Sequence, residues 1–388
     1  MLGSAQALIA HPSIELIVAA PSQLVQSLTE IQGQYIRYYV FPLGKGNHKY
    51  NNEYRSYWRE IKEKTHPDIV HIHGTEFSHG LSYIEECGVD NVVVSIQGLV
   101  SVYARYYNYG LSNYDIFKNL TLRDLIRGSL FSQRRAFERR GEYEIQLLKN
   151  VRHIIGRTSW DKGHIWAINP KANYHFCNET LRSEFYSGQW TYEKCIPHTI
   201  FISQISYPIK GFHQILKALP YILRHFPDTQ LRVAGGNLTD TNSFRRRLLL
   251  SGYGKYLKYL IKLHELEKHI EFLGYLDAEQ MKQEYLRANV FVCPSSIENS
   301  PNSLGEAQLL GVPIIASYVG GIPDMIKDDE CHMYRFEEVE MLAMMVSRLF
   351  SENSIDTSKL QEEAKERHDP QINADILIGI YEHILDGN

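Results

Sequence analysis

Residues 293–317 of this chain read CPSSIENSPNSLGEAQLLGVPIIAS, and two glutamates stand eight positions apart within this stretch. Apolar residues on both sides of the polar middle indicate two buried strands with a helix between them. Glu298 and Glu306 should therefore lie at the carboxyl edge of a parallel sheet, which is where open α/β sheets bind ligands. The stretch predicts an α/β fold and the place of a binding site.

The spacing of the two glutamates also indicates the kind of ligand. Glu298 falls in the loop, and Glu306 falls about two turns into the following helix. Between them, residues 300–303 form a helix start whose backbone N–H groups suit a phosphate. A ligand with a central diphosphate and hydroxyls at both ends, such as a sugar nucleotide, would satisfy all three parts. The alternative is a pair of surface carboxylates, one of them favoured by the helix dipole.

Length and composition limit the class of protein. A chain of 388 residues is expected to form two domains, and 44% hydrophobic with 22% charged residues is typical of globular proteins. The net charge of −4 argues against general affinity for nucleic acid. The five scattered cysteines predict reduced thiols, and no segment reads as a membrane span or secretory signal. We therefore expect a cytoplasmic protein.

Short β-rich runs alternate with helical stretches in both halves of the chain, which indicates parallel, doubly wound sheets. Residues 183–197 are the expected linker, residues 115–150 a long helical region, and residues 370–385 a closing amphipathic helix. The expected strands are 15–20, 35–41, 69–73, 91–96 and 151–156 in the first half, and 199–203, 230–236, 270–274, 288–293 and 312–317 in the second.

Several short motifs occur in order from about residue 196 to residue 330. They are Pro208-Ile-Lys210-Gly211-Phe212, Gly235-Gly236, Phe272-Leu-Gly274-Tyr275, the Glu298/Glu306 pair and Gly320-Gly-Ile-Pro323-Asp. On these motifs the chain resembles the glycosyltransferases of family 4, of the type that builds bacterial surface polysaccharides. The resemblance is weaker over the first half.

The resemblance implies the GT-B fold, in which two Rossmann-like doubly wound domains face a central cleft and a C-terminal helix crosses back to the first domain. The expected boundaries are 1–197 for an acceptor-side domain, 198–368 for a domain that binds the donor, and 369–388 for the returning helix.

The family's site residues can be carried over by position. Glu306 would bind the ribose hydroxyls of the donor, because a carboxylate accepts two such bonds at once. Glu298 would contact the donor sugar near the reacting carbon, and Lys210 would neutralise the leaving diphosphate. Lys210 has the alternative of a solvated loop lysine. Further donor-site residues that the resemblance implies are Pro301, Asn302 and Ser303 at the diphosphate, and Gly274 and Tyr275 near the base.

Three departures from the family pattern stand out. The chain opens on residues 1–10, which read as the helix that follows the family's first strand and Gly-rich turn, so we expect a start assigned too late. Gln204 stands where the family often has arginine and cannot supply a second positive charge, so either Lys210 acts alone or another basic residue compensates. Gln97 replaces a histidine; it can bind a sugar but cannot act as a base, which suits a mechanism whose leaving phosphate takes the proton. Gly320 and Gly321 predict either a plain turn or a loop beside the donor sugar.

Two histidines, His71 and His73, alternate along one expected strand. Alternation places both on one face without a third ligand, so we expect no metal and no cofactor other than the donor itself. His73, at the carboxyl end of the strand, has two readings, a cleft residue or a buried and satisfied histidine.

Residues 103–140 mix tyrosines with arginines and lysines. This composition suits a surface with anionic head groups or a diphosphate-linked lipid sugar, and predicts peripheral contact with the inner membrane. The alternative is a helical pair whose arginines pair with neighbouring carboxylates.

The sequence thus predicts a glycosyltransferase that moves a sugar from a nucleotide-diphosphate-sugar to a carbohydrate or lipid-linked acceptor. Retention at the anomeric carbon is implied by the family resemblance alone. The alternatives are a non-catalytic or truncated sugar-nucleotide-binding protein, and a sugar-nucleotide epimerase of the same fold. The base and sugar of the donor, the acceptor and the oligomeric state do not follow from the sequence.

Overall fold

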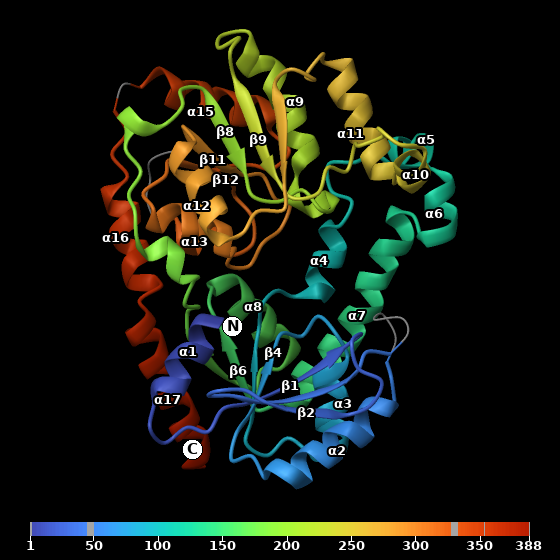
Figure 1. Ribbon diagram of the computed structural model, residues 1–388, viewed down its shortest axis with the longest axis vertical. Helices are drawn as coiled ribbons and strands as arrows, with labels where there is room; N and C mark the ends of the chain where they lie inside the picture. Colours follow the sequence, from blue (N-terminus) through green and yellow to red (C-terminus); the bar gives the residue numbers. More distant parts are fainter. Residues whose placement is uncertain (1, 45–49, 327–332, 353, 388) are drawn as a thin grey trace. The chain divides into compact units, whose positions relative to one another are not determined.

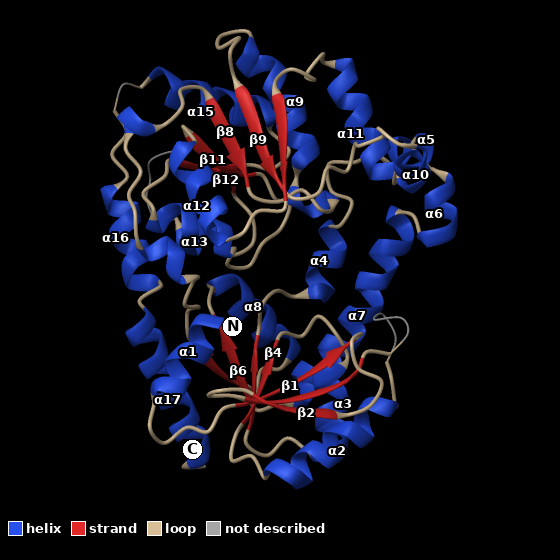
Figure 2. Cartoon of the chain, viewed as in Figure 1, coloured by secondary structure: helices blue, strands red, loops and turns tan. Residues whose placement is uncertain are grey.

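The computed structural model describes residues 2–44, 50–326, 333–352 and 354–387. They form two compact units, each built from more than one segment of the chain (Figures 1 and 2). The first unit comprises residues 1–104, 136–181 and 368–388, and the second comprises residues 105–135 and 182–367.

The second unit contains one six-stranded sheet in the order β10-β9-β8-β11-β12-β13, and every pair of neighbours is parallel. Counted along the unit, this is the 3-2-1-4-5-6 order of a Rossmann sheet, which changes direction between its first and fourth strands. The change of direction therefore lies between β8 and β11. The strands are β8 (Thr199–Ile202), β9 (Gln230–Ala234), β10 (Ile270–Gly274), β11 (Val290–Cys293), β12 (Ile314–Ser317) and β13 (Met333–Tyr334).

Helices cover this sheet, and every residue of β8, β11 and β12 is buried. The long helices are α9 (Phe212–Leu223), α11 (Gly252–Leu263), α12 (Ala278–Arg287), α13 (Asn302–Leu309), α15 (Val339–Ser351) and α16 (Ser358–Arg367). The short ones are α5 (Asn113–Lys118), α6 (Leu122–Arg127), α10 (Phe244–Leu249), α14 (Ile322–Met325), and the 3₁₀ turns η1 (Ser183–Tyr186), η2 (Tyr192–Lys194) and η3 (Pro208–Lys210).

The first unit contains two sheets. One is parallel, with the order β4-β5-β6-β7, and the other has the order β1-β3-β2, in which β2 runs antiparallel to β3. The strands are β1 (Ile17–Ser22), β2 (Thr29–Gln32), β3 (Arg37–Pro42), β4 (Val70–His73), β5 (Val92–Ser95), β6 (His153–Gly156) and β7 (Asn173–Phe176).

The last helix of the chain packs into the core of the first unit. Leu377, Ile380 and Ile384 of α17 form one apolar cluster with Leu8 of α1 and Val93 of β5. The helices that extend through or lie in this unit are α1 (Leu2–Ala10), α2 (Glu53–Thr65), α3 (His79–Cys87), α4 (Val100–Tyr106), α7 (Leu130–Asn150), α8 (Ser159–Ile168) and α17 (Pro370–Leu385).

The expected strands are all confirmed to within a few residues, as are helices over residues 2–10 and 370–385. Three strands were not predicted: β2 and β7 carry polar residues and are largely half-buried or exposed, and β13 has only two residues. The expected helical region of residues 115–150 is broken into α5, α6 and α7.

The last segment of the first unit begins at residue 368, within one residue of the expected start of the returning helix at 369. Around the expected boundary at residue 197 the units divide differently, because residues 105–135 and 182–197 group with the second unit. There α5 packs against α11, α6 against α10, and η1 against α12 and α13. Within the described residues, no helix combines the length and apolar character needed to cross a membrane.

Candidate functional site

The candidate site lies where the sheet of the second unit changes direction. β8 and β11 are hydrogen-bonded neighbours, and the loops that leave their carboxyl ends carry Lys210 and Glu298. Connections from these two strands run to opposite sides in the sheet, which opens a crevice at their ends. The topology therefore brings together two side chains that are 88 residues apart in sequence.

Lys210 and Glu298 form a largely buried ion pair. The Lys210 Nζ donates to Glu298 Oε1 at 2.6 Å, and the Ser295 hydroxyl donates to the same oxygen at 2.7 Å. Burial opposes the charged form of Lys210, but the neighbouring Glu298 carboxylate outweighs this effect and raises the pKa of Lys210. The lysine therefore carries its positive charge at the switch point at neutral pH.

Backbone packing holds the Lys210 turn against the end of β11. The Ser296 N–H donates to the Ile209 carbonyl at 2.7 Å. Gly211 follows with a φ of +68°, and a Cβ at this position would lie 1.6 Å from the Pro294 carbonyl oxygen. Only glycine allows both the left-handed backbone and this approach. The Lys-Gly order in the motif thus has a geometric reason.

The backbone of Gly320 packs closely against the backbone of Glu298, as Gly211 does against Pro294. Its φ is +56°, and a Cβ there would lie 1.8 Å from the Glu298 carbonyl oxygen, to which the Gly321 N–H donates at 3.1 Å. The two glycines therefore fix the backbone of Glu298 as well as forming a turn.

Glu306 is buried on α13 and is held by an arginine. The Arg182 Nε and Nη2 donate to its two carboxylate oxygens at 2.9 Å and 3.0 Å, a bidentate pair. Burial raises the pKa of Glu306 to about 7, and Arg182 opposes that rise. The Arg182 guanidinium also lies over the Phe185 ring, 4.7 Å from its centroid.

Sequence reasoning missed Arg182. It lies 124 residues from Glu306, next to the segment interpreted as a linker, and no motif marks it. Ser295 and Tyr285 were also missed; the Tyr285 hydroxyl donates to the Ser303 carbonyl at 2.9 Å and holds the start of α13. A search for polar residues beside the motifs could have found Ser295 alone.

The start of α13 lies between the two glutamates. Pro301 is its N-cap residue in an extended conformation, and Asn302 and Ser303 are its first two residues. Their backbone N–H groups have no helical carbonyl one turn earlier to bond. The helix start therefore offers donors and the positive end of its dipole on the same side as Lys210.

Gly274 is the last residue of β10, and Tyr275 follows it. The Gly235 N–H donates to the Gly274 carbonyl at 2.7 Å, and both glycines have positive φ. The exposed Tyr275 ring lies over Gly236, where a Cβ would be 3.0 Å from its hydroxyl. The exposed Gln204, on the loop after β8, donates to the Ser206 hydroxyl at 3.3 Å.

The remaining candidates, His73 and Gln97, belong to the first unit. His73 is the last residue of β4, Gln97 lies just after the neighbouring strand β5, and Gln97 packs near Gly74. The His73 ring is exposed and stacks on His71 at 3.8 Å between centroids. Both ring nitrogens of His71 are hydrogen-bonded, Nδ1 to the Tyr381 hydroxyl at 2.6 Å and Nε2 to the Ser95 hydroxyl at 2.5 Å. His71 is therefore the histidine of the pair whose hydrogen bonds are satisfied. Among the residues that the structure describes, no three His, Cys, Asp or Glu side chains gather in a metal-binding group.

The second unit therefore combines a buried ammonium, a helix start and two buried carboxylates along one sheet edge. This set can bind a ligand that has both a polyanionic part and hydroxyl groups.

The fold as a whole is that of the GT-B glycosyltransferases. The chain matches the structure of sucrose-phosphate synthase from Thermosynechococcus elongatus with a TM-score of 0.70, at 16% identity, over 100% of this chain and 92% of that one. Residues 195–367 match the family model described as glycosyl transferases group 1.

Two curated relatives match parts of the chain. Spore coat protein SA of Bacillus subtilis is 28% identical over 39% of this chain and 39% of its own length. A GDP-mannose-dependent monoacylated alpha-(1-6)-phosphatidylinositol monomannoside mannosyltransferase of Corynebacterium glutamicum is 26% identical over 37% of this chain and 36% of its own length. The match thus covers less than two fifths of the length of each relative.

Proposed function

We propose that the chain is a family 4 glycosyltransferase that moves a sugar from a nucleotide-diphosphate-sugar to a carbohydrate or lipid-linked acceptor. The observation that carries the proposal is the buried Lys210–Glu298 pair at the switch point of the sheet, with Glu306 beyond the start of α13. The match of residues 195–367 to the glycosyl transferases group 1 model supports it independently.

Each part of the donor has a partner in this proposal. Glu306 accepts hydrogen bonds from the two ribose hydroxyls, while Arg182 favours the charged form of its carboxylate and orients it. The amides of Asn302 and Ser303, at the start that Pro301 caps, hold the diphosphate. Gly274 and Tyr275 line the base. Gln204 lies on the same loop as Lys210 and reaches the phosphates through its amide, without charge.

Lys210 has the main electrostatic role. In the structure its charge is balanced by Glu298; in the donor complex the diphosphate competes for it and Glu298 turns to the hydroxyls of the donor sugar. As the bond between the anomeric carbon and the phosphate oxygen breaks, its electron pair moves onto the diphosphate. Lys210 stabilises that growing charge.

We propose that the transfer retains the configuration at the anomeric carbon. The acceptor hydroxyl forms the new bond to this carbon, and its proton passes to the departing phosphate oxygen. No side-chain base is needed on the acceptor side, which fits an amide at Gln97. His73 and Gln97 then serve as hydrogen-bonding residues at the ends of β4 and β5.

The acceptor proposal draws on the relative from Corynebacterium glutamicum, whose name specifies a phosphatidylinositol mannoside acceptor. A lipid-linked or surface-polysaccharide acceptor of this kind places the protein at the cytoplasmic face of the inner membrane, in contact through residues 103–140.

The experiment is a panel of nucleotide-diphosphate-sugars tested against the purified chain, with melting shift and nucleotide release recorded together. Glu306→Gln is the test variant and Glu267→Gln, at an exposed position, is the matched control. We expect one donor to shift the melting temperature in the control but not in Glu306→Gln, with release stimulated by acceptor extract.

The other outcomes separate the alternatives. Nucleotide release with an altered free sugar and no need for acceptor would identify an epimerase. A shift that Glu306→Gln abolishes, without release under any condition, would identify a sugar-nucleotide-binding protein. A shift that is equal in Glu306→Gln would place the donor elsewhere and contradict the proposed site.

A further inference from the structure

Helix α6 in the second unit has its apolar side chains turned outward. Leu122, Leu125 and Ile126 are spaced i, i+3, i+4 and are 69%, 75% and 84% exposed. The buried residue of this helix is a carboxylate, Asp124. A helix on the surface of a globular protein ordinarily turns its apolar stripe to the core and its charges to water. The orientation of α6 is the reverse.

Polar contacts hold α6 in this orientation. Asp124 accepts from the Thr121 N–H at 3.1 Å and from the Gly252 N–H at the start of α11 at 2.8 Å. The Thr121 hydroxyl donates to the Leu250 carbonyl at 2.9 Å. Because these bonds fix the inner face of the helix, its leucines and isoleucine remain in water, where their exposure is unfavourable.

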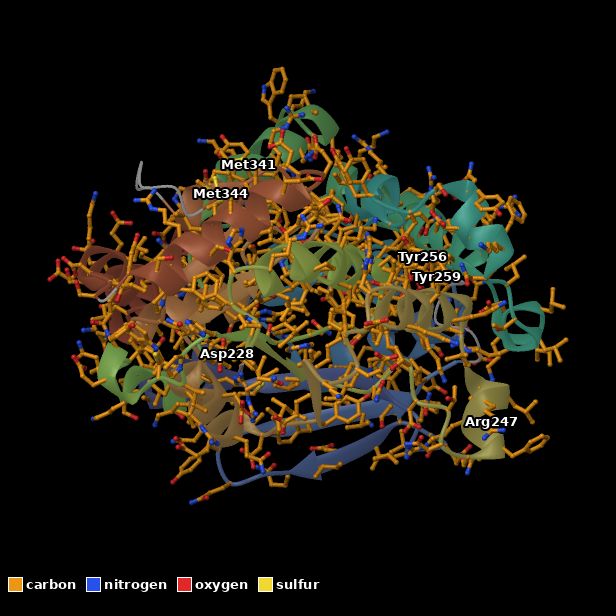
Figure 3. The ribbon with its side chains drawn as sticks, turned by 90° about the horizontal axis from the view of Figure 1, so that it is seen from above. Asp228, Arg247, Tyr256, Tyr259, Met341 and Met344 are labelled. Carbon is orange, nitrogen blue, oxygen red and sulfur yellow. The ribbon has the colours of Figure 1, made fainter. Side chains whose placement is uncertain are left out.

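The adjacent helix α10 buries none of its residues. Phe244 and Leu248, one turn apart, are 76% and 51% exposed, and α10 packs against α6. Figure 1 shows α5, α6, α10 and α11 grouped at one side of the second unit, and Figure 3 shows Arg247 of α10 at the margin of the same group. The apolar side chains of α6 and α10, together with Phe117 of α5, form what we call the α6/α10 surface.

This surface is strongly basic. Helices α5, α6 and α10 contain six Lys and Arg but only two Asp, although the whole chain has a net charge of −4. Both aspartates lie in inward or capping positions: Asp124 in the contacts above, and Asp115 in the cap of α5. A third aspartate, Asp240, precedes α10 and pairs with Arg246. The consecutive arginines Arg245, Arg246 and Arg247 are all exposed. The α6/α10 surface therefore combines projecting apolar side chains with an excess of positive charge.

We infer that the α6/α10 surface docks onto a membrane that carries anionic lipids. Leucine, isoleucine and phenylalanine side chains enter the boundary between head groups and acyl chains, while the arginines of α6 and α10 pair with lipid phosphates. A second copy of the chain is a poorer occupant, because a two-fold contact would set like charges against each other. The inference deepens the proposed function, since it brings the enzyme to a lipid-linked acceptor.

Only half of this surface follows from the expected membrane region of residues 103–140. Helix α10 lies more than 100 residues further along the chain and joins α6 only in the fold. The α6/α10 surface does not include Arg134, Arg139 and Arg140, which also lie in the expected membrane region of residues 103–140.

The test is sedimentation of the full chain with vesicles of phosphatidylcholine alone and with one quarter phosphatidylglycerol. We expect binding to the anionic vesicles, weakened by salt, and little binding to the neutral ones. Leu125→Ser with Ile126→Ser should reduce the bound fraction about tenfold or more. Replacement of Arg245, Arg246 and Arg247 by glutamine should have a similar effect. The matched control is Leu24→Ser, an exposed leucine in the first unit.

Melting temperatures of the leucine and isoleucine variants should equal that of the native chain, because the replaced side chains are exposed. The arginine variant also loses the Arg246–Asp240 ion pair and the bond from Arg247 to the Thr241 carbonyl, so its binding is compared at a temperature well below its own melting temperature. The inference would be overturned by absence of binding to anionic vesicles, by equal binding of the Leu125/Ile126 variant, or by sedimentation velocity showing a dimer that this variant dissociates. Donor-induced melting shifts in the absence of lipid test the proposed function separately. If the chain does not bind vesicles but still shows a donor-induced melting shift, the inference fails and the proposed function is retained.

Discussion

The switch-point site and the α6/α10 surface depart from ordinary burial in opposite directions. At the site, charged side chains are buried: Lys210 with Glu298, and Glu306, which pairs with the more exposed Arg182. On the surface, Leu125 and its neighbours are exposed. Buried charges cost desolvation energy, and exposed apolar groups cost hydration energy. The second unit carries both unfavourable features. The buried charges lie where we propose that it binds the donor, and the exposed apolar side chains lie where we propose that it binds a membrane.

The largest effect is expected for Lys210→Met. This change leaves Glu298 buried without its cation, which should destabilise the fold by about 3–5 kcal/mol, and removes the charge proposed to stabilise the leaving diphosphate. Single-turnover nucleotide release should fall by roughly 10²–10³-fold. The control is Lys268→Met at an exposed position. Unchanged release in Lys210→Met would remove this residue from the mechanism.

Two glycine substitutions, one at the site and one for comparison in α8, test how tightly the backbone packs around Lys210. Gly211→Ala should lower the free energy of unfolding by about 2–4 kcal/mol, since its Cβ would overlap the Pro294 carbonyl and φ is positive. Gly163→Ala in α8, where a Cβ meets nothing within 4 Å, should raise it by about 0.5–1 kcal/mol. Urea unfolding measures both. If the two substitutions changed the free energy of unfolding equally, Gly211 would not be in close contact with the Pro294 carbonyl.

Arg182→Gln should weaken binding of UDP or GDP about tenfold at pH 7. Removing the arginine takes away the effect that opposes the rise in the pKa of Glu306, which is already about 7. A protonated Glu306 accepts fewer hydrogen bonds from the ribose, so the affinity for the nucleotide should increase with pH in both proteins. The increase should occur at a higher pH in the variant than in the native chain. Calorimetry from pH 6 to 8.5 measures this, and Glu306→Gln should show a flat profile. A pH-independent affinity in the native chain would contradict the ribose role of Glu306.

The smallest effect is expected for Leu125→Ser in the absence of lipid. The side chain is exposed, so the free energy of unfolding should change by no more than about 0.5 kcal/mol and nucleotide release should not change. Thermal melting with release in solution checks both quantities. A large destabilisation would show that Leu125 packs against something in solution, and the contrast with the switch-point site would fail.

Much of the second unit could be predicted from the sequence. Each buried strand there is a run of apolar residues, and the helix that carries Glu306 begins directly after a proline with polar residues, so local pattern sufficed. The first unit was harder, because β2 and β7 are short and polar, and they are strands only because neighbours pair with them.

The sequence by itself determined the α/β class, the order of the strands along the chain and the spacing of the two glutamates, since these depend on residues within one or two turns of each other. Only the tertiary structure decided which distant side chains meet: Lys210 with Glu298, Arg182 with Glu306, and α10 with α6. Those pairings follow from strand order and helix packing, and no local pattern of residues encodes them.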